Sequence, residues 1–354
     1  MNALVKYETG RGHVELREVP EPRCSDGQVK IEVSYCGICG TDLHVYDDTF
    51  RNYPPVILGH EFSGRVVEIG GQVNRVACGD RVAVLPASAV TCGSCLYCRM
   101  GHFMFCAGRR GMGHGVNGAF ARYAVVREDQ AFRLPDALSL EEGALCEPLA
   151  SAVKAVTEVT QVRLGDVALV SGPGPIGLLC LKLLVSEDIR TIVTGTADDA
   201  LRLDAAKRIG AAAVINVDQE DLIAVVNEET GGAGVDVAFE CAGAAPSARQ
   251  CLLALRPLGR YVQVGIFGRD IIIGLDVICH KQLRVSGSVG YDVATWERSL
   301  RILRQGAVRL DDLITHKLPL SGWREAFDLC RSKRAIKVLL SPTTDMGLGR
   351  APTG

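Results

Sequence analysis

The sequence predicts two domains, one built mainly of β-strands and one built around a parallel α/β sheet. Its 354 residues exceed what a single ordinary hydrophobic core contains, so two cores are expected. Up to residue 85, short runs alternate between apolar and polar side chains, as in residues 29–33, and such alternation favours half-buried strands. After residue 138, short apolar strands alternate with helical patterns, which is typical of a doubly wound parallel sheet.

The mainly β part consists of three strand-rich stretches with one interruption. The alternating runs occur in residues 1–35, 56–85 and 119–135. Residues 86–118 differ, because they contain four cysteines, seven glycines and few aliphatic side chains. A lobe of this composition has too little apolar surface to form its own core, so it needs another source of stability.

The α/β part begins at residues 139–142 (Ser-Leu-Glu-Glu), which have the pattern of a capped helix start. The expected elements then follow in order: strand 167–170, helix 178–186, strand 191–194, helix 201–209, strands at 214–215, 235–239 and 261–264, helix 295–305 and a final strand at 337–340. The last dozen residues are polar and rich in glycine and proline, so we expect them to be frayed.

Composition narrows the class of protein. Hydrophobic residues make up 47% and charged residues 23% of the chain, which is typical of a globular protein. The formal net charge of −2 gives no basic surplus that would favour nucleic acid or an anionic membrane as partner. The sequence has neither an apolar run long enough to span a bilayer nor an export signal, so we expect a cytoplasmic protein. Fourteen cysteines in such a chain predict reduced thiols or metal ligands.

Four of these cysteines lie within fifteen residues and predict a structural zinc site. Cys92, Cys95, Cys98 and Cys106 have the spacing C-x2-C-x2-C-x7-C, within a lobe that we place at residues 88–112. Structural zinc takes four soft ligands in a tetrahedron, and two-residue gaps let a tight turn bring successive sulfurs to one ion. The alternative, four merely buried or disulfide-bonded cysteines, fits a polar loop poorly.

A second, dispersed group of residues has the chemistry of a catalytic zinc site. Cys39, His60, Glu61 and Glu147 are a thiol, an imidazole and two carboxylates, each in a glycine- or proline-containing segment. Catalytic zinc takes three protein ligands and leaves one position exchangeable, and this mixture suits zinc better than calcium or magnesium. Taken singly, each residue is equally compatible with a solvated loop side chain.

A glycine-rich turn predicts a dinucleotide site. The sequence Gly172-Pro173-Gly174-Pro175-Ile176-Gly177 is G-x-G-x-x-G, and it lies between a predicted strand and a predicted helix. Gly172 permits the turn, Gly174 lets a pyrophosphate approach the backbone, and Gly177 packs the helix on the strand. After the second strand come Asp198 and Asp199, which would bind ribose hydroxyls and repel a 2′-phosphate, whereas Arg202 would attract one. We expect NAD as cofactor, with NADP as the alternative.

Together these motifs resemble the medium-chain zinc alcohol dehydrogenases over nearly the whole chain. The resemblance rests on GICGTDLH at residues 37–44, GHEFSG at residues 59–64, the four-cysteine lobe and the glycine loop. The glutamate of GHE and the Glu-Pro of residues 147–148 resemble the polyol and threonine dehydrogenase subgroup. The resemblance implies a GroES-like β-barrel domain formed by residues 1–150 and 291–354, with a Rossmann domain, residues 151–290, inserted.

The resemblance also implies roles for single residues. Cys39, His60 and Glu61 match the catalytic zinc ligands, and Glu147 matches a carboxylate that ligates zinc or holds its water. Thr41 and His44 match a proton relay. The residues that match cofactor contacts beyond the glycine loop are Ala197, Asp198, Arg202, Val264, Gly265, Ile266, Ser288, Val289 and Gly290.

Two departures from the family pattern affect the expected specificity. The ribose-binding aspartate of NAD-dependent relatives aligns with Ala197, so Asp198 is one position late. Gly290 stands where polyol dehydrogenases often have arginine, so the substrate need not be sorbitol.

The expected activity is reversible, zinc-dependent and NAD(P)-linked oxidation of a secondary alcohol in a polyol or sugar-like molecule to a ketone, with two zinc ions per chain. L-Threonine 3-dehydrogenase, butanediol dehydrogenase and aminocyclitol dehydrogenase are alternatives, and a non-catalytic zinc- and nucleotide-binding protein is a more distant one. The resemblance further implies a homo-oligomer, either a tetramer or a dimer.

Overall fold

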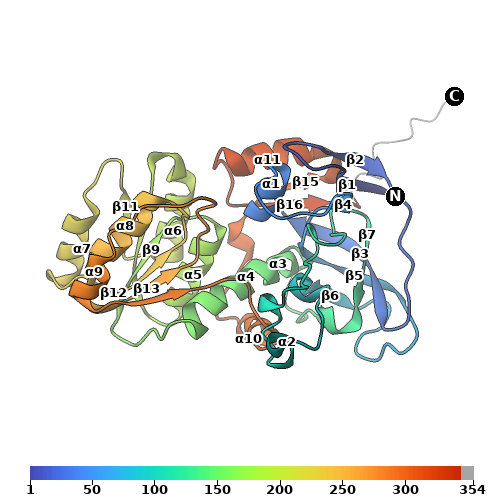
Figure 1. Cartoon of the computed structure of the whole chain (residues 1–354), viewed down its shortest axis with the longest axis horizontal. Helices are drawn as coiled ribbons and strands as arrows, with labels where there is room; N and C mark the ends of the chain where they lie inside the picture. The colour runs from blue at the N-terminus through green and yellow to red at the C-terminus, as the bar shows by residue number, and fades with distance from the viewer. Residues whose placement is uncertain (344–354) are drawn as a thin grey trace. The chain divides into compact units, whose positions relative to one another are not determined.

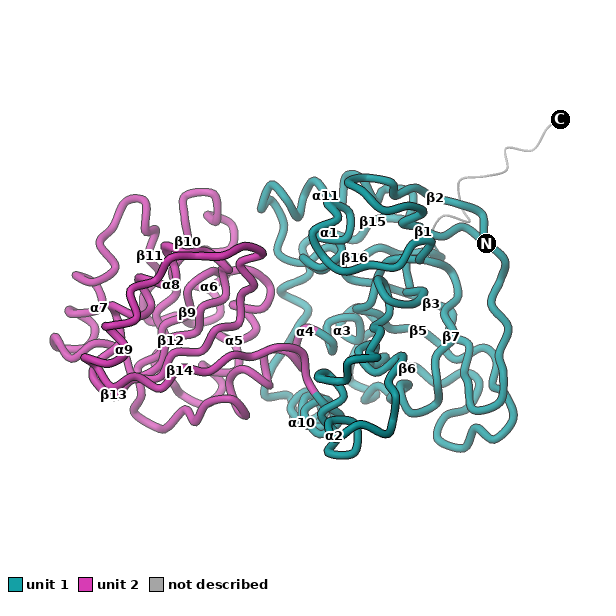
Figure 2. The backbone as a smooth tube through the Cα atoms, in the orientation of Figure 1, with its two compact units in different colours: residues 1–147, 292–354 teal, residues 148–291 magenta. Residues whose placement is uncertain are grey.

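The computed structural model describes residues 1–343 and contains two compact units (Figure 2). The first consists of residues 1–147 together with the chain from residue 292 onward, and the second of residues 148–291. The expectation of a frayed C-terminal end concerns residues that, apart from Thr343, lie outside the described part. No helix within residues 1–343 is both long enough and apolar enough to cross a bilayer.

The first unit is built on two sheets (Figure 1). A small antiparallel sheet has the order β2-β1-β4, formed by β2 (Val14–Glu18), β1 (Asn2–Lys6) and β4 (Val56–Ile57). The larger sheet has the order β15-β16-β3-β5-β6-β8, and β7 also pairs with β3. Its strands are β15 (Ile314–Pro319), β16 (Lys337–Ser341), β3 (Gln28–Gly37), β5 (Glu61–Ile69), β6 (Arg81–Val84), β8 (Ala131–Arg133) and β7 (Tyr123–Arg127). Because β15 and β16 come from the end of the chain, the C-terminal segment completes this sheet.

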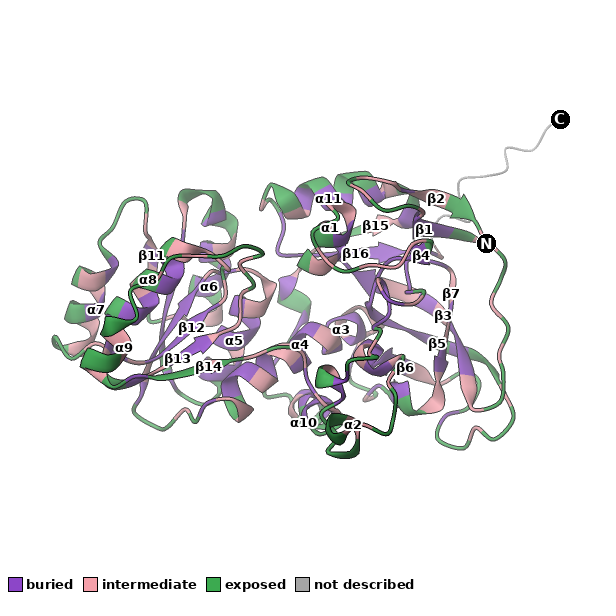
Figure 3. Cartoon of the chain, viewed as in Figure 1, coloured by how far each residue is buried: buried purple, intermediate pink, exposed green. Residues whose placement is uncertain are grey.

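The large sheet of the first unit has an apolar inner face, as the sequence alternation predicts. Much of β3 is buried (Figure 3). Its residues Val29, Ile31 and Val33 are fully buried and belong to one core cluster with Phe62 and Phe120. Helices accompany this sheet: α1 (Gly40–Tyr46), α2 (Leu96–Arg99), α3 (Leu140–Ala144), α10 (Val293–Arg304) and α11 (Trp323–Arg331). The predicted cap of α3 is confirmed, since Ser139 and Glu142 each accept a hydrogen bond from the other's backbone N–H.

The second unit is a six-stranded parallel sheet with the order β11-β10-β9-β12-β13-β14, which confirms the predicted doubly wound arrangement. The strands are β9 (Val167–Ser171), β10 (Arg190–Gly195), β11 (Ala213–Asn216), β12 (Val235–Glu240), β13 (Leu255–Gln263) and β14 (Arg284–Gly287), and the helices are α5 (Pro175–Ser186), α6 (Ala200–Ile209), α7 (Leu222–Thr230), α8 (Ala245–Ala254) and α9 (Asp276–Lys281). Helix α4 (Cys146–Val153) leads the chain into this unit. Helix α5 starts three residues earlier than predicted, because Pro175 occupies the first helical position, where a missing N–H costs nothing.

The strand order determines where a ligand can bind in this unit. From β9 the chain adds β10 and then β11 on one side of β9. It then crosses back and adds β12 on the other side of β9, so the strand order reverses next to β9. Ligands of open α/β sheets bind at the carboxyl ends of the strands at such a reversal. The glycine loop at residues 172–177 directly follows β9 and therefore lies at this switch point.

Candidate metal and cofactor sites

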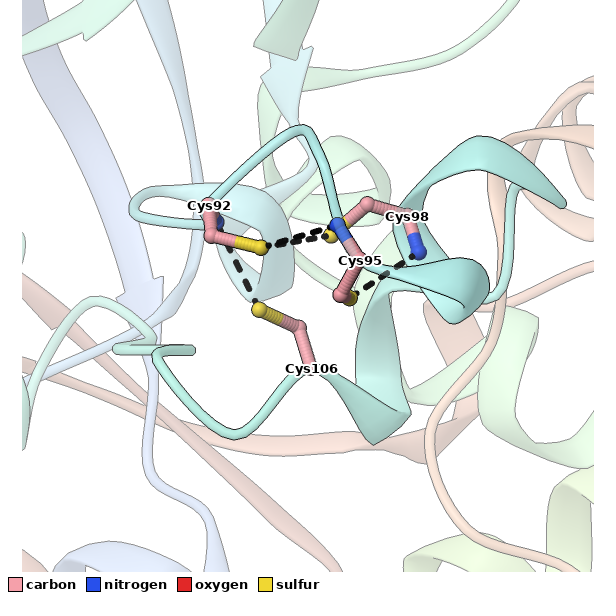
Figure 4. A group of neighbouring side chains, drawn as sticks. All are labelled: Cys92, Cys95, Cys98 and Cys106. Atoms are coloured by element: carbon pink, nitrogen blue, oxygen red, sulfur yellow. Dashed lines mark hydrogen bonds between the residues drawn. The ribbon is translucent and has the colours of Figure 1, made fainter.

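The four cysteines of the lobe converge on one point (Figure 4). Their sulfur atoms all lie within 4.8 Å of one another, and the Sγ atoms of Cys92 and Cys98 are 3.9 Å apart. Backbone N–H groups point at the sulfurs: that of Cys95 lies 3.3 Å from Cys92 Sγ, and that of Cys98 lies 3.4 Å from Cys95 Sγ. The local turn thus arranges both the ligands and the donors that stabilise them.

The electrostatics of the lobe fit a bound cation. Hydrogen bonds from the backbone of Cys95 and Ser94 lower the pKa of Cys92 to about 6, so this residue is readily a thiolate. Desolvation and the neighbouring thiol of Cys95 instead raise the pKa of Cys98 to about 12. Four thiolates this close repel one another unless a positive ion lies between them, and tetrahedral zinc is the ion that four sulfur ligands prefer.

The dispersed residues also converge. Cys39, His60 and Glu61 each offer one ligand atom, and these atoms lie within 4.8 Å of one another. Cys39 is the residue before α1, and Glu61 opens β5 directly after His60. Both His60 and Glu61 are buried, whereas Cys39 is partly exposed. Thiolate, imidazole and carboxylate at this spacing would hold a zinc ion through three protein ligands.

Asp42, which the sequence analysis did not select, orients this group. Its buried carboxylate accepts a hydrogen bond from the backbone N–H of Cys39 at 2.9 Å and another from that of Gly59 at 3.3 Å. Its Oδ1 also lies 3.6 Å from the buried Nδ1 of His60, which has no hydrogen-bond partner within residues 1–343. A carboxylate behind a histidine fixes the ring and leaves Nε2 for the metal.

Lys337 is a second residue that the motifs did not indicate. Its ammonium lies 2.6 Å from Glu61 Oε2 and donates a hydrogen bond to the carbonyl of Ile38 at 3.0 Å, and both charged side chains are buried. Burial lowers the pKa of Lys337, but the charges of Glu61 and Cys39 outweigh it and place the pKa above its ordinary value. Glu61 is therefore shared between this cation and the ligand group.

The other residues predicted to be catalytic, Thr41, His44 and Glu147, are not members of the group formed by Cys39, His60 and Glu61. Thr41 and His44 are three residues apart on α1 and so lie on one face of that helix. His44 is exposed, and its Nδ1 is 3.1 Å from the hydroxyl of Thr49, which leaves Nε2 outward. Glu147, in α4, is not a member of the ligand group that contains Cys39. The predicted roles of these three residues stay predictions.

The glycine loop has the shape that a pyrophosphate needs. Gly172 has φ +100°, and a Cβ there would lie 2.6 Å from the backbone nitrogen of Ala242. A Cβ on Gly177 would overlap the carbonyl of Gly172, so helix and turn pack with no room for a side chain. Gly174 instead faces open space at the N-terminus of α5. Open space beside unpaired helix N–H groups fits the phosphates of a dinucleotide.

The carboxyl ends of β10 and β11 carry an acidic group that includes a residue missed in the sequence. Asp218, which follows β11, accepts a hydrogen bond from the backbone N–H of Ala197 at 2.8 Å. Asp199 is buried and caps its own turn, and its Oδ1 lies 3.5 Å from Arg202. Asp198 is exposed beside them. Arg202 therefore already has a carboxylate partner.

The remaining predicted cofactor residues lie at the same edge of the sheet. The backbone N–H groups of Val264 and Gly265 donate to the carbonyl of Glu240 at 2.9 and 2.8 Å, and Ser288 N–H donates to the carbonyl of Gln263 at 2.8 Å. Ile266 is 67% exposed and Val289 is 54% exposed. Apolar side chains left open at the strand ends are suited to contact the faces of a ring.

Known proteins match this combination of sites. The model of the alcohol dehydrogenase GroES-like domain matches residues 25–136, and that of the zinc-binding dehydrogenases matches residues 175–305. The chain belongs to the zinc-dependent alcohol dehydrogenase family. This result confirms the resemblance seen in the motifs, and the protein is an enzyme that uses zinc and a nicotinamide dinucleotide.

Three similar proteins illustrate the family. A sorbitol dehydrogenase of Halalkalibacterium halodurans is 40% identical over 97% of this chain and 99% of its own. A D-arabitol-phosphate dehydrogenase of Enterococcus avium is 37% identical over 96% of this chain and 97% of its own. The crystal structure of the 2R,3R-butanediol dehydrogenase from Bacillus subtilis superimposes with a TM-score of 0.85 at 33% identity, covering 96% of this chain and 99% of its own.

The two ligand groups predict a stoichiometry of two zinc ions per chain. Cys95→Ser, which removes a lobe ligand, and His60→Ala, which removes a ligand of the dispersed group, should each retain one zinc. Cys279→Ser, at an exposed cysteine outside both groups, should retain both. Metal analysis of the purified variants measures this, and full zinc content in Cys95→Ser would contradict the lobe assignment.

The buried ion pair predicts an asymmetry between two lysine variants. Lys337→Met strands the carboxylate of Glu61 without a cation, which should lower the free energy of unfolding by about 3–5 kcal/mol. Lys317→Met breaks the exposed pair with Glu141 and should cost less than about 1 kcal/mol. Urea denaturation compares the two, and adding Glu61→Gln to Lys337→Met should restore part of the loss. Equal losses in both single variants would show that burial of the pair is unimportant.

Proposed function

We propose that this protein is a polyol dehydrogenase that oxidises a secondary alcohol of a polyol or sugar-like molecule to a ketone, reversibly, with NAD as acceptor. The observation that carries the proposal is the convergence of Cys39, His60 and Glu61 on one point, oriented by Asp42. The sorbitol and D-arabitol-phosphate dehydrogenases among its relatives make free and phosphorylated polyols the first substrates to consider.

In this proposal the two units bind different components of the reaction. The first unit holds the substrate and both zinc ions, with Cys39, His60 and Glu61 as ligands of the catalytic one and Glu147 as the carboxylate that ligates it or holds its water. The second unit holds NAD through the glycine loop and the strand ends around Gly265 and Ser288. Support comes from the positions of the ligand groups and the switch point, each within a single unit.

Thr41 and His44 form the proposed path for the proton. Bound zinc would supply Lewis acidity that lowers the pKa of the substrate hydroxyl toward neutrality. In this proposal the hydroxyl of Thr41, two residues from Cys39, accepts that proton and passes it on. His44 follows on the same helix face and is exposed, so it would pass the proton to solvent. The glycine loop and the strand ends of the second unit would hold the nicotinamide dinucleotide, which would supply the acceptor for the hydride.

NAD is favoured over NADP by the charges at the ribose end. Asp198, Asp199 and Asp218 gather at the ends of β10 and β11, and their negative charge would repel a 2′-phosphate. Arg202, the candidate for binding that phosphate, already lies beside Asp199. The proposed ribose ligands are Asp198 and Asp218, and Asp218 compensates for the alanine at position 197.

We also propose a homo-oligomer, a dimer or a tetramer, in a reducing compartment such as the cytoplasm. The outer strand β14 leaves one edge of the parallel sheet open, and Val285 on it is half exposed. Ile272 and Leu275, which precede α9, are 84% and 66% exposed. Pairing with a second copy would cover such an edge. None of the fourteen cysteines, all within residues 1–343, forms a disulfide, which suits a reducing environment.

Turnover of alcohols tests the proposed function. The zinc-loaded protein should form NADH from at least one member of a panel of polyols, polyol phosphates, butanediol, cyclitols and L-threonine. Thr41→Val should slow this on the order of 100-fold at neutral pH, and less at high pH, because hydroxide then removes the proton. Thr9→Val, at an exposed threonine of the same unit, is the control. Absence of NADH from every alcohol would overturn the proposal.

The acidic group predicts cofactor preference. Asp198→Ala combined with Asp218→Asn, which keeps an acceptor for Ala197, should raise the ratio of kcat/KM for NADP to that for NAD by at least about tenfold, since like charges next to a phosphate are costly. Asp204→Ala, at an exposed aspartate on α6, should leave the ratio unchanged. A wild-type enzyme that prefers NADP would contradict this account of the ribose end.

A further inference from the structure

Two loop segments of the first unit lie against the proposed catalytic zinc ligands, and they are joined to each other. The ring of Phe50 meets the ring of His114 edge-on, with centroids 5.1 Å apart. The backbone N–H of Tyr53 donates to the carbonyl of His114 at 2.9 Å. Residues 50–53, which follow α1, and residues 109–114, at the end of the cysteine lobe, therefore form one surface.

This surface is held close to His60. A Cβ on Gly113 would lie 3.0 Å from the carbonyl of Gly59, the residue before His60, and a Cβ on Gly118 would overlap that carbonyl. Burial lowers the pKa of His114 to about 4, and the charge of nearby His60 contributes. Residues 50–53 and 109–114 thus border the ligand group within the first unit.

These two segments carry two exposed arginines, Arg51 and Arg110, next to one tyrosine ring. The guanidinium carbon of Arg110 lies 4.2 Å from the centre of the Tyr53 ring, and that of Arg51 lies 5.1 Å from the same centre. Both arginines are exposed, and within residues 1–343 neither side chain has an ion pair or a hydrogen bond. Stacking on a ring uses the face of a guanidinium and leaves the N–H donors at its edge available.

Arg122 and Arg127 of this unit, in contrast, are paired with carboxylates. Arg122 pairs with Glu32 at 3.0 Å, and Arg127 pairs with Asp129 at 2.9 Å. Asp48, a nearby carboxylate on the same loop, already accepts hydrogen bonds from Gly10 and Asn52. Two like charges at one tyrosine repel each other, and an anion bound by both would offset that repulsion.

We infer that the substrate carries an anionic group, remote from the reacting carbinol, which Arg51 and Arg110 bind beside Tyr53. The inference rests on the proposed function, because it concerns the same site. A phosphate monoester and a carboxylate are the two sources of such a group. Both match the planar fork of a guanidinium, and a phosphate carries up to two negative charges for the two arginines. Arg51 and Arg110 are then the residues that determine substrate specificity.

The test compares alcohols with and without the anion. Zinc-loaded protein is assayed with sorbitol, sorbitol 6-phosphate, D-arabitol, D-arabitol 5-phosphate and L-threonine. Wild-type kcat/KM should be at least about tenfold higher for the anionic member of a pair. Arg51→Ala and Arg110→Ala should each lower that value about ten- to a hundredfold, since a charged hydrogen bond is removed, and leave the free polyol within about twofold. Arg110→Lys should lose less, because it keeps the charge.

Two further arms make the outcome decisive. Arg23→Ala, at an exposed arginine of the same unit without an ion pair among the described residues, should change neither value. Titration calorimetry with sorbitol 6-phosphate measures binding independently of turnover, and the Arg51→Ala/Arg110→Ala double variant should lose it. Arginine-dependent preference for L-threonine alone would support recognition of an anion and identify it as a carboxylate.

The inference and the proposed function fail in different ways. If the free polyols are the better substrates and the arginine variants leave the ratio of anionic to free substrate unchanged, the inference is overturned while the dehydrogenase activity stands. If no alcohol is oxidised but sorbitol 6-phosphate binds and the double variant loses that binding, the anion site stands and the proposed reaction falls. If the double variant binds it as tightly as the wild type does, the anion site is overturned whatever the activity.

Discussion

The buried carboxylate of Asp42 is the contact on which the proposed catalytic centre depends. It joins the start of α1 to the turn before β5, because it accepts hydrogen bonds from the backbone of both Cys39 and Gly59. The same carboxylate faces His60, so one side chain sets the separation of two ligands and the orientation of one ring. Lys337, on β16, also belongs to this arrangement. Without its ammonium group, Glu61 would be an uncompensated buried charge.

Close backbone packing places the chain after the cysteine lobe against the turn that carries His60. Glycines at positions 59, 113 and 118 let the chain after the cysteine lobe cross directly over the turn that carries His60. The lobe itself has few apolar side chains, so its four thiols and the ion that they fit take the place of a core. Arg110, near the end of the lobe, and Arg51, in the stretch after α1, are both exposed beside Tyr53. The proposed anion site therefore combines the cysteine lobe with a second loop.

In the second unit, the strand order determines where the proposed cofactor site lies. The reversal of strand order beside β9 leaves open space at the helix N-terminus where Gly174 lies, and the strand ends on either side supply the rest of the cofactor surface. Acidic residues from two strand ends lie near Ala197, and the proposed preference for NAD rests on their combined charge and not on a single residue. In these proposals, charge in the second unit disfavours a phosphate, whereas charge in the first unit attracts an anion.

The sequence by itself determined what depends on short spacing. The four cysteines of the lobe, the capped start of α3, the strand–glycine loop–helix motif and the alternation in β3 all involve residues a few positions apart, so local geometry settles them. Only the tertiary structure decided the contacts between distant segments. Glu61 and Lys337 are 276 residues apart, and Arg51 and Arg110 come from different loops that both pack on Tyr53. No periodicity encodes such pairs, because packing of whole strands and loops, and not the pattern along the chain, determines which side chains become neighbours.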